Sequence, residues 1–211
     1  MILDKKDLKI ITQQTLDFYS QHSNSFHEKT RTHDVSQNIT CLLESLEGTP
    51  PFILLDFGCG PGRDLKTFKS LGHTAIGIDG CGEFVKMARA YSGCEVWQQD
   101  FLKLDLPLNY FNGVFANASL FHVPKQELSR ILKELNATLK PQGVVFSSNP
   151  RGNNEEGWNQ NRYGVYHDLE TWGAYMKESG FIEISHYYRP SNLSRDQQPW
   201  LASLWRSTRQ Q

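Results

Sequence analysis

An apolar run that ends in a glycine-rich turn constrains this chain more than any other feature. Residues 52–56 read Phe-Ile-Leu-Leu-Asp, and Gly58, Gly60 and Gly62 follow directly. A short, almost wholly apolar run between turn residues is typical of a strand in a parallel sheet, buried on both faces. Glycines after such a strand let the backbone turn sharply and approach a ligand closely. The segment therefore predicts a ligand site at the carboxyl end of a buried parallel strand.

Helical and strand patterns alternate through most of the chain. Apolar residues recur at helical spacing over about 4–21 and again over 35–46, and Pro50 and Pro51 end the second helix. After the first strand, the same criteria predict helices around 65–71, 84–91 and 128–139, and strands at 73–79, 94–98, 113–117 and 144–148. Strands that alternate with helices through short connections imply right-handed crossovers and a parallel sheet covered on both faces.

The pattern changes beyond residue 148. Residues 149–161 are polar and rich in asparagine, and they form a segment too long for a simple connection, which predicts a lid or a disordered loop. A helix is expected from Asp168, its cap, to Ser179. Two strands at 181–189 and 199–207 then close the chain, and we expect them to pair as a hairpin at the edge of the sheet.

Composition argues against several classes of partner. The formal net charge of −1 provides no basic surface for a phosphate backbone, so we expect no nucleic-acid partner. The first residues lack the apolar core of a secretory signal, and no apolar run approaches a membrane span, so we expect a cytoplasmic protein with no membrane partner. The four cysteines form no CxxC pair, which predicts reduced thiols and no metal site.

Acidic residues follow the next two strands of the predicted sheet. Asp79 ends the strand at 73–79, where a carboxylate can accept hydrogen bonds from both hydroxyls of a ribose. Asp100 follows the strand at 94–98, where it can reach an adenine amino group. Each acid alone is equally well explained as a helix cap or a solvated turn. Because a glycine turn and two acids follow three successive strands, we predict a cofactor that contains a nucleoside.

Residues 55–62, Leu-Asp-Phe-Gly-Cys-Gly-Pro-Gly, resemble the first motif of the class I methyltransferases that use S-adenosylmethionine, and the similarity extends over about 52–148. The resemblance implies a three-layer α/β/α sandwich around a doubly wound, seven-stranded, mostly parallel sheet with an antiparallel C-terminal strand. The cofactor would be S-adenosylmethionine and the product S-adenosylhomocysteine. With no linker in the chain, we expect one methyltransferase domain, comprising an N-terminal helical cap (1–48), a cofactor-binding core (52–148) and an acceptor-side loop, helix and edge strands (149–211).

The resemblance also assigns cofactor contacts to individual residues. Asp56 would lie near the amino group of the methionine portion, and Arg63 near its carboxylate or as a partner at the helix start. Asp79 would hold the ribose, and Asp100 with the Phe101 backbone would contact the adenine. The predicted cofactor contacts are Tyr19, Asp56, Gly58, Cys59, Gly60, Gly62, Arg63, Asp79, Gly80, Asp100, Phe101 and Asn117.

Three residues expected near the cofactor also have a simple packing explanation. Cys59 lies inside the glycine loop without a paired base, so we expect a small space-filling residue there and not a nucleophile. Tyr19 and Phe26 would close over the cofactor as a lid, and packing explains them nearly as well.

The acceptor side is less constrained. Residues 117–124, Asn-Ala-Ser-Leu-Phe-His-Val-Pro, are similar to the family segment that faces both cofactor and acceptor, but they lack the acid followed by proline that some relatives use for amino-group acceptors. His122 is the candidate catalytic base and acceptor contact, because histidine titrates near neutral pH; a role only in shaping the loop is the stronger alternative. Arg162 and Tyr163 are candidate acceptor contacts in a region of cations and aromatics, which a solvated loop explains equally well.

These features predict a transferase that methylates a small-molecule acceptor by in-line displacement, with positioning as the main contribution of the protein. A nucleotide-linked oxidoreductase or epimerase is a poorer explanation, because its fingerprint is Gly-x-Gly-x-x-Gly and this chain has Gly58-x-Gly60-x-Gly62. A regulatory module that binds S-adenosylmethionine without catalysis is also compatible with the sequence. The sequence leaves open both the identity of the acceptor and the choice between a monomer and a homodimer.

Overall fold

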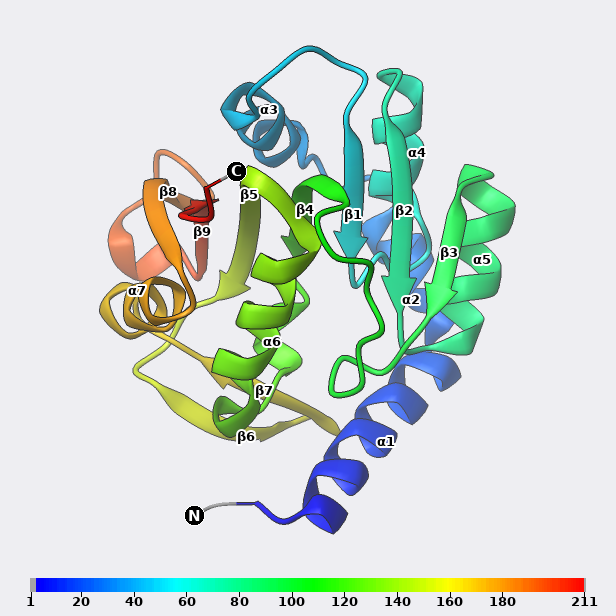
Figure 1. Cartoon of the computed structure of the whole chain (residues 1–211). Coiled ribbons are helices and arrows are strands. Elements are labelled where there is room, and N and C mark those ends of the chain that lie inside the picture. The colour runs from blue at the N-terminus through cyan, green and yellow to red at the C-terminus, as the bar shows by residue number, and fades with distance from the viewer. Residues whose placement is uncertain (1–2, 211) are drawn as a thin grey trace.

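A seven-stranded sheet with the order β3-β2-β1-β4-β5-β9-β8 forms the centre of the computed structural model, which describes residues 3–210 (Figure 1). Strands β1 to β5 are parallel where they pair, and β9 is antiparallel to both β5 and β8. The strands are β1 (Ile53–Phe57), β2 (Thr74–Asp79), β3 (Glu95–Gln98), β4 (Phe111–Asn117), β5 (Leu139–Pro150), β8 (Phe181–Arg189) and β9 (Trp200–Ser207).

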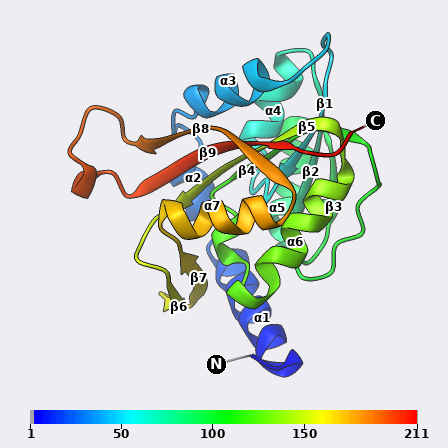
Figure 2. The same ribbon diagram turned by 60° about the vertical axis from the view of Figure 1, so that its left-hand side comes forward.

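Helices cover both faces of this sheet, as Figure 2 shows. Helices α3 (Ser36–Ser45), α4 (Arg63–Ser70) and α5 (Gly82–Ser92) pack on one face through a buried apolar cluster, and α6 (Lys125–Thr138) and α7 (Leu169–Glu178) pack on the other through a second cluster. A fully buried Leu or Phe contributes about 1.5–3 kcal/mol, so these two clusters hold the three layers together. The predicted fold class is confirmed.

The strand ends bring distant segments of the chain to one edge of the sheet. In the parallel register Asp56 pairs with Gly77 on one side and with Phe115 on the other, and Asn117 pairs with Ser148. The connections that follow β1, β2, β4 and β5 therefore lie next to one another. The glycine loop, Asp79 and the segment after Asn117 meet at this carboxyl edge, as expected of a doubly wound sheet.

Helices α1 (Lys5–Gln21) and α2 (Ser23–Thr30) lie at the carboxyl ends of β1, β2 and β3 (Figure 1). Helix α1 begins with a capping box, in which Asp4 accepts from the Asp7 backbone and Asp7 from the Asp4 backbone. Apolar periodicity does not predict α2, because Phe26 is its only large apolar residue. Its contacts are tertiary, since Phe26 packs against Tyr19 of α1 and Phe84 of α5 and the Thr30 carbonyl accepts from Arg63.

The disordered loop predicted over 149–161 is instead a regular hairpin, and the role of this segment as a lid stays a prediction. Strand β5 continues to Pro150, and β6 (Glu155–Asn159) pairs with β7 (Arg162–Tyr166) as an antiparallel hairpin. Gln160 and Asn161 form its two-residue turn with φ of 49° and 63°, the left-handed pair that such hairpins require. The sequence concealed this hairpin because most of β6 is exposed and has no apolar alternation.

The two C-terminal strands form the predicted hairpin, but only one of them is an edge strand. β9 lies between β5 and β8, and β8 forms the edge of the sheet. Trp205 in β9 is fully buried, and its Nε1 donates to Ser203 Oγ at 2.9 Å. An internal position of β9 explains the apolar content of this ending better than an edge position does.

Gly62 sets the start of α4. Its φ of +91° lies in the left-handed region, and a Cβ at this position would be 2.7 Å from the Ala88 Cα in α5. Only glycine therefore allows both the turn and the close approach of the two helices.

We predict that Gly62→Ala lowers the free energy of unfolding by about 2–5 kcal/mol, the sum of left-handed strain and overpacking. Gly72→Ala is the matched control, because Gly72 also has a positive φ (+86°) but a Cβ there would meet no atom within 4 Å, and about 1–2 kcal/mol is expected. Urea unfolding measures both losses. Equal losses would contradict a role for the α4–α5 contact.

Candidate functional site

A cavity of about 830 Å³ lies between the carboxyl edge of the sheet and helices α1 and α2. This volume is near the upper end of the roughly 300–1,000 Å³ typical of small-molecule sites. The cavity brings together most of the predicted site residues. Those that line it are Tyr19, Gly58, Cys59, Gly60, Arg63, Asp79, Gly80, Asp100, Phe101, Asn117, His122 and Arg162.

Asp79 is tied to the glycine loop and still has capacity for a ligand. Its Oδ2 accepts from the Gly60 N–H at 2.9 Å and its Oδ1 from the Cys81 N–H at 2.8 Å. A carboxylate has about four lone-pair positions, so two stay available to accept the two hydroxyls of a ribose. Burial raises the pKa of Asp79 to about 6, against the lowering effect of these backbone N–H groups. The carboxyl group therefore fits the sugar that the sequence predicts.

Asp100 and Phe101 form the next part of the cavity wall. Asp100 Oδ1 accepts from the Leu102 N–H at 2.9 Å, so the carboxyl closes a turn and also lines the cavity. The Phe101 ring stacks on Phe57, with the ring centroids 4.2 Å apart. The packing of Phe101 fixes this segment, which presents its polar groups at the end of the cavity nearest β3.

The donors of Arg63 are used inside the protein. Its Nε and Nη2 donate to the two oxygens of Asp64 at 2.6 and 2.8 Å, and its Nη1 donates to the Thr30 carbonyl at 2.9 Å. Asn117 Nδ2 lies 3.4 Å from Asp64 Oδ2. Of the two roles expected for Arg63, the partner at the helix start is the one that these contacts describe.

Three predicted site residues are not part of the cavity wall. Asp56 is buried with no partner for Oδ2, and burial together with the neighbouring Asp64 raises its pKa well above the usual range. Gly62 serves the α4–α5 contact. The Tyr163 ring is buried in a small cluster with Ile11, because alternation along β7 places it opposite Arg162.

Cys59 lies in the cavity wall but is poorly suited to act as a nucleophile. Its side chain is buried, and a Cβ on Gly77 would lie 2.9 Å from its Sγ, so it fills the space between the loop and β2. Burial, with a contribution from Asp56, raises the pKa of this thiol well above its ordinary value. The geometry supports the space-filling interpretation.

His122 is held by two hydrogen bonds that define its tautomer. Its Nδ1 lies 2.6 Å from the Tyr163 carbonyl oxygen and its Nε2 2.8 Å from the Tyr19 hydroxyl. A carbonyl can only accept, so Nδ1 carries the proton and Nε2 accepts from the Tyr19 hydroxyl. Burial lowers the pKa of His122 to about 4, and the charge of Arg162 contributes in the same direction. The ring is therefore neutral near pH 7.

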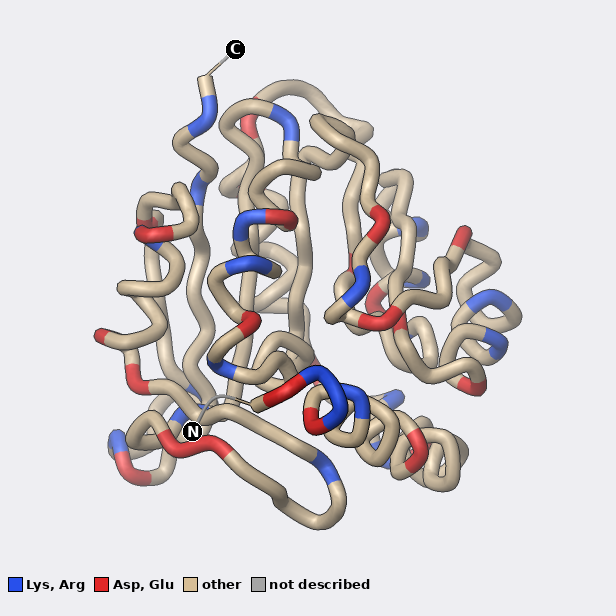
Figure 3. Tube along the Cα trace, turned by 60° about the horizontal axis from the view of Figure 1, so that its bottom comes forward, with Lys and Arg blue, Asp and Glu red and all other residues tan. Residues whose placement is uncertain are grey.

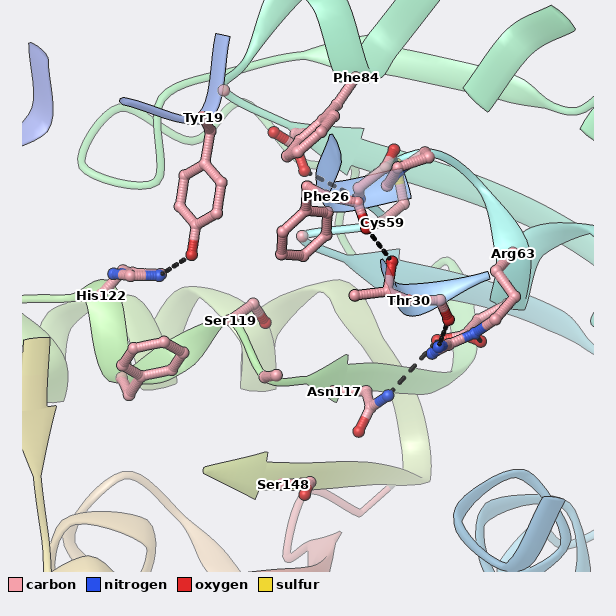
Figure 4. A pocket seen from close by; sticks show the side chains of 18 of the residues that line it. Tyr19, Phe26, Thr30, Cys59, Arg63, Phe84, Asn117, Ser119, His122 and Ser148 are labelled. Carbon is pink, nitrogen blue, oxygen red and sulfur yellow. Dashed lines mark hydrogen bonds and ion pairs between the residues drawn. The ribbon is translucent and has the colours of Figure 1, made fainter. Parts of the chain in front are cut away.

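Aromatic rings form the wall of the cavity beside His122. The centroids of Tyr19, Phe26 and Phe84 lie 5.2–5.6 Å from one another. Figure 4 shows these rings around the cavity, with the Tyr19 hydroxyl directed at His122. The two N-terminal helices thus contribute an apolar cover to the site.

Sequence reasoning missed a polar network at the opposite side of the cavity. Asn38 Oδ1 accepts from the Tyr187 hydroxyl at 2.8 Å and from Arg189 Nη1 at 2.9 Å, and Asn38 Nδ2 donates to Asn117 Oδ1 at 3.1 Å. This network joins α3, β4 and β8. No sequence signal identifies it, because each residue alone reads as an ordinary surface polar group and only the tertiary structure brings the three elements together.

Metal and membrane features are absent from the part of the chain that the structure describes. Among residues 3–210, no group of three or more His, Cys, Asp or Glu residues is placed to hold a metal ion. Within the same range, no helix has the length and apolar character needed to cross a membrane.

We predict that His122 stays neutral, with its proton on Nδ1, from pH 8 down to about pH 5. The reason is that burial disfavours the charged ring, so protonation begins only as the pH approaches about 4. Long-range ¹H–¹⁵N correlation spectra of ¹⁵N-histidine-labelled protein report the tautomer, and His122→Asn assigns the signal. Protonation with a midpoint above pH 6, or a proton on Nε2, would contradict the hydrogen bonds described above.

Comparison with known proteins gives a consistent family. Residues 54–143 match the family model described as "Methyltransferase domain". The chain is 31% identical over 139 residues to a probable tRNA methyltransferase 9B of Bos taurus. This alignment covers 59% of this chain and 30% of that protein. The chain is 30% identical over 104 residues to a trans-aconitate 2-methyltransferase of Azoarcus sp., covering 48% and 40%. The chain thus spans about a third of the length of the tRNA methyltransferase relatives it matches.

Solved structures show the same fold at low identity. A 1,6-didemethyltoxoflavin-N1-methyltransferase of Burkholderia thailandensis with bound S-adenosylhomocysteine has a TM-score of 0.78 at 17% identity, covering 99% of this chain and 92% of that one. The [4+2]-cyclase SpnF has a TM-score of 0.75 at 16% identity, covering 93% and 96%. The fold is common to both, although their reactions differ, so the site must indicate the function.

Proposed function

We propose that this chain is a class I S-adenosylmethionine-dependent methyltransferase that transfers a methyl group from S-adenosylmethionine to a small-molecule acceptor. The methyltransferase domain matched over residues 54–143 and the shared fold support the proposal. The single observation that carries the proposal is the junction of Asp79 with the glycine loop at the cavity wall. It provides a carboxylate with two unused acceptor positions beside a glycine loop that lines the cavity.

The residues proposed to hold the cofactor divide along the cavity. Asp79 and Asp100 would bind the ribose and the adenine, and the loop from Gly58 to Gly60 would lie along the methionine portion. When bound, S-adenosylmethionine supplies an electrophilic methyl group on a sulfonium. The acceptor would form a bond to the methyl carbon, and the electron pair of the broken C–S bond would stay on sulfur. The protein contributes mainly by aligning the two reactants, which is worth up to roughly 7–11 kcal/mol of the barrier.

Tyr19 and His122 are proposed to take the acceptor's proton where the acceptor has one to lose. The neutral His122 Nε2 accepts from the Tyr19 hydroxyl, so a proton from the acceptor can pass to the Tyr19 oxygen as the Tyr19 proton passes to Nε2. The Tyr163 carbonyl keeps the ring oriented through Nδ1 and stabilises the imidazolium that results. This assigns His122 the role of general base, acting through Tyr19.

The position and lining of the cavity favour a small acceptor over a nucleic acid. Helices α1 and α2 cover one side of the cavity, and its wall is largely aromatic and apolar near Tyr19. In the view of Figure 3, the Lys and Arg positions among residues 3–210 are interspersed with Asp and Glu and do not gather on one side, whereas a phosphate backbone is bound by clustered basic residues. A tRNA acceptor is the second candidate, because two relatives carry that name.

We predict that S-adenosylhomocysteine binds the wild-type chain and that Asp79→Ala weakens binding at least about 100-fold, because two hydrogen bonds to a charged acceptor are lost. The affinity should also fall as the pH decreases below about 6, since protonation of Asp79 removes acceptor positions. Isothermal titration calorimetry measures both effects. Asp105→Ala, an exposed acid outside the cavity wall, is the control.

Asp79→Asn separates ligand binding from loop structure, because it keeps the side-chain size and one acceptor for the loop. We expect it to fold with a cooperative thermal transition and still to bind weakly. Unchanged affinity in both Asp79 variants, or no binding to the wild type, would overturn the cofactor assignment.

We predict that incubation with methyl-tritiated S-adenosylmethionine labels a component of a metabolite extract that passes a 1 kDa filter, and leaves acid-precipitated tRNA unlabelled. The cover that α1 and α2 form on one side of the cavity is the reason, because such a site admits a small molecule more readily than a folded polynucleotide. Scintillation counting of the two fractions decides between them, with Asp79→Ala as the inactive control. Label confined to tRNA would contradict the small-molecule acceptor.

A further inference from the structure

Arg162 is unusual among the arginines of the cavity. Four arginines line the cavity, and three have hydrogen-bond partners within the protein: Arg31 with Glu28, Arg63 with Asp64, and Arg189 with Asn38. Among the described residues, no carboxylate oxygen lies within 4.0 Å of the Arg162 guanidinium, and its Nε is buried without a hydrogen-bond partner. The protein therefore places an uncompensated positive charge in the wall of its site.

The surrounding structure fixes Arg162 without neutralising it. Its neighbour Tyr163 is anchored at both backbone groups, since its N–H donates to Thr15 Oγ1 at 3.0 Å and its carbonyl accepts from His122. The Arg162 guanidinium carbon lies 5.1 Å from the Phe18 ring centroid and 5.9 Å from that of Tyr19. Aromatic faces hold a cation in place without neutralising its charge. The guanidinium is also close enough to the Tyr19 hydroxyl to oppose, by its charge and by hydrogen bonding, the rise in the pKa of Tyr19 that burial causes.

A half-buried cation without an anion carries a cost, and proteins retain such groups mainly where a ligand supplies the opposite charge. The planar guanidinium presents paired N–H donors that match the two oxygens of a carboxylate. Arg162 also lies over the ring of Tyr19, the residue hydrogen-bonded to His122. An anion bound there would be held at the end of the cavity where the proton is removed.

We propose that Arg162 binds a carboxylate of the methyl acceptor, so that the acceptor is an organic acid; this inference rests on the proposed function. The acid group pairs with the guanidinium in a bidentate manner. The remainder of the acceptor lies against Tyr19 and faces the cofactor. Arg162 is thus a specificity-determining residue that selects acids over their uncharged analogues.

The test compares matched acids and amides on protein saturated with S-adenosylhomocysteine. The probes are 4-fluorobenzoate and 4-fluorophenylacetate with the corresponding amides, and ¹⁹F line broadening measures their binding. We expect the wild type to bind at least one acid more tightly than its amide. Arg162→Gln should lose this preference and bind the acid at least about tenfold more weakly, as loss of a charge-assisted contact implies. Arg31→Gln, which removes a charge already paired with Glu28, should retain it.

Calorimetry with S-adenosylhomocysteine distinguishes the two proposals. We expect Arg162→Gln to bind it as the wild type does, because the acceptor alone uses this arginine. A comparable loss of S-adenosylhomocysteine affinity would mean that Arg162 holds the cofactor's own carboxylate and would overturn the inference. Equal binding of acids and amides, no binding of either acid, or an equal loss in Arg31→Gln would overturn it while the cofactor assignment stands. Failure of the wild type to bind S-adenosylhomocysteine would overturn the proposed function as well.

Discussion

The attachment of the glycine loop to the end of β2 is the interaction on which the site depends. The Ile78 carbonyl accepts from the N–H groups of Gly58 and Cys59 at 2.8 and 3.0 Å, and the Asp79 carboxyl accepts from that of Gly60. Three successive N–H groups of the loop are thus satisfied by one strand end. A loop with these donors unpaired in a buried position would be unstable, so β2 determines the shape of the turn that follows β1.

A second set of contacts adds the acceptor side to this framework. The Tyr163 carbonyl of β7 fixes His122 on the segment after β4, and the Tyr163 N–H donates to Thr15 of α1. Three segments far apart in the chain are thereby tied through the backbone groups of one residue, whose direction does not depend on a flexible side chain. This gives the Tyr19–His122 pair a defined geometry.

The charged groups of the site carry a cost that the rest of the fold offsets. The pKa of Asp79 is raised to about 6, so its contribution to stability is greatest in acid and is lost as the pH rises through that value. His122 behaves in the opposite way, because its pKa is lowered to about 4 and its neutral form is the stable one above that value. Near neutral pH the protein holds an ionised Asp79, a neutral His122 and an unpaired Arg162 together. Such local costs are expected where a site is shaped for a ligand.

The sequence by itself determined the strands of the parallel sheet and the edge of that sheet at which the acids of the site lie. Apolar runs bounded by glycine and proline identify parallel strands from local pattern alone, and the acids that follow them must share an edge because the carboxyl ends of parallel strands do so. Tyr163, Asn38 and the β6–β7 hairpin illustrate what only the tertiary structure decided. Their contacts join α1 to β7 and α3 to β8, and such pairings arise from the packing of distant elements, which leaves no periodic signal in a single chain.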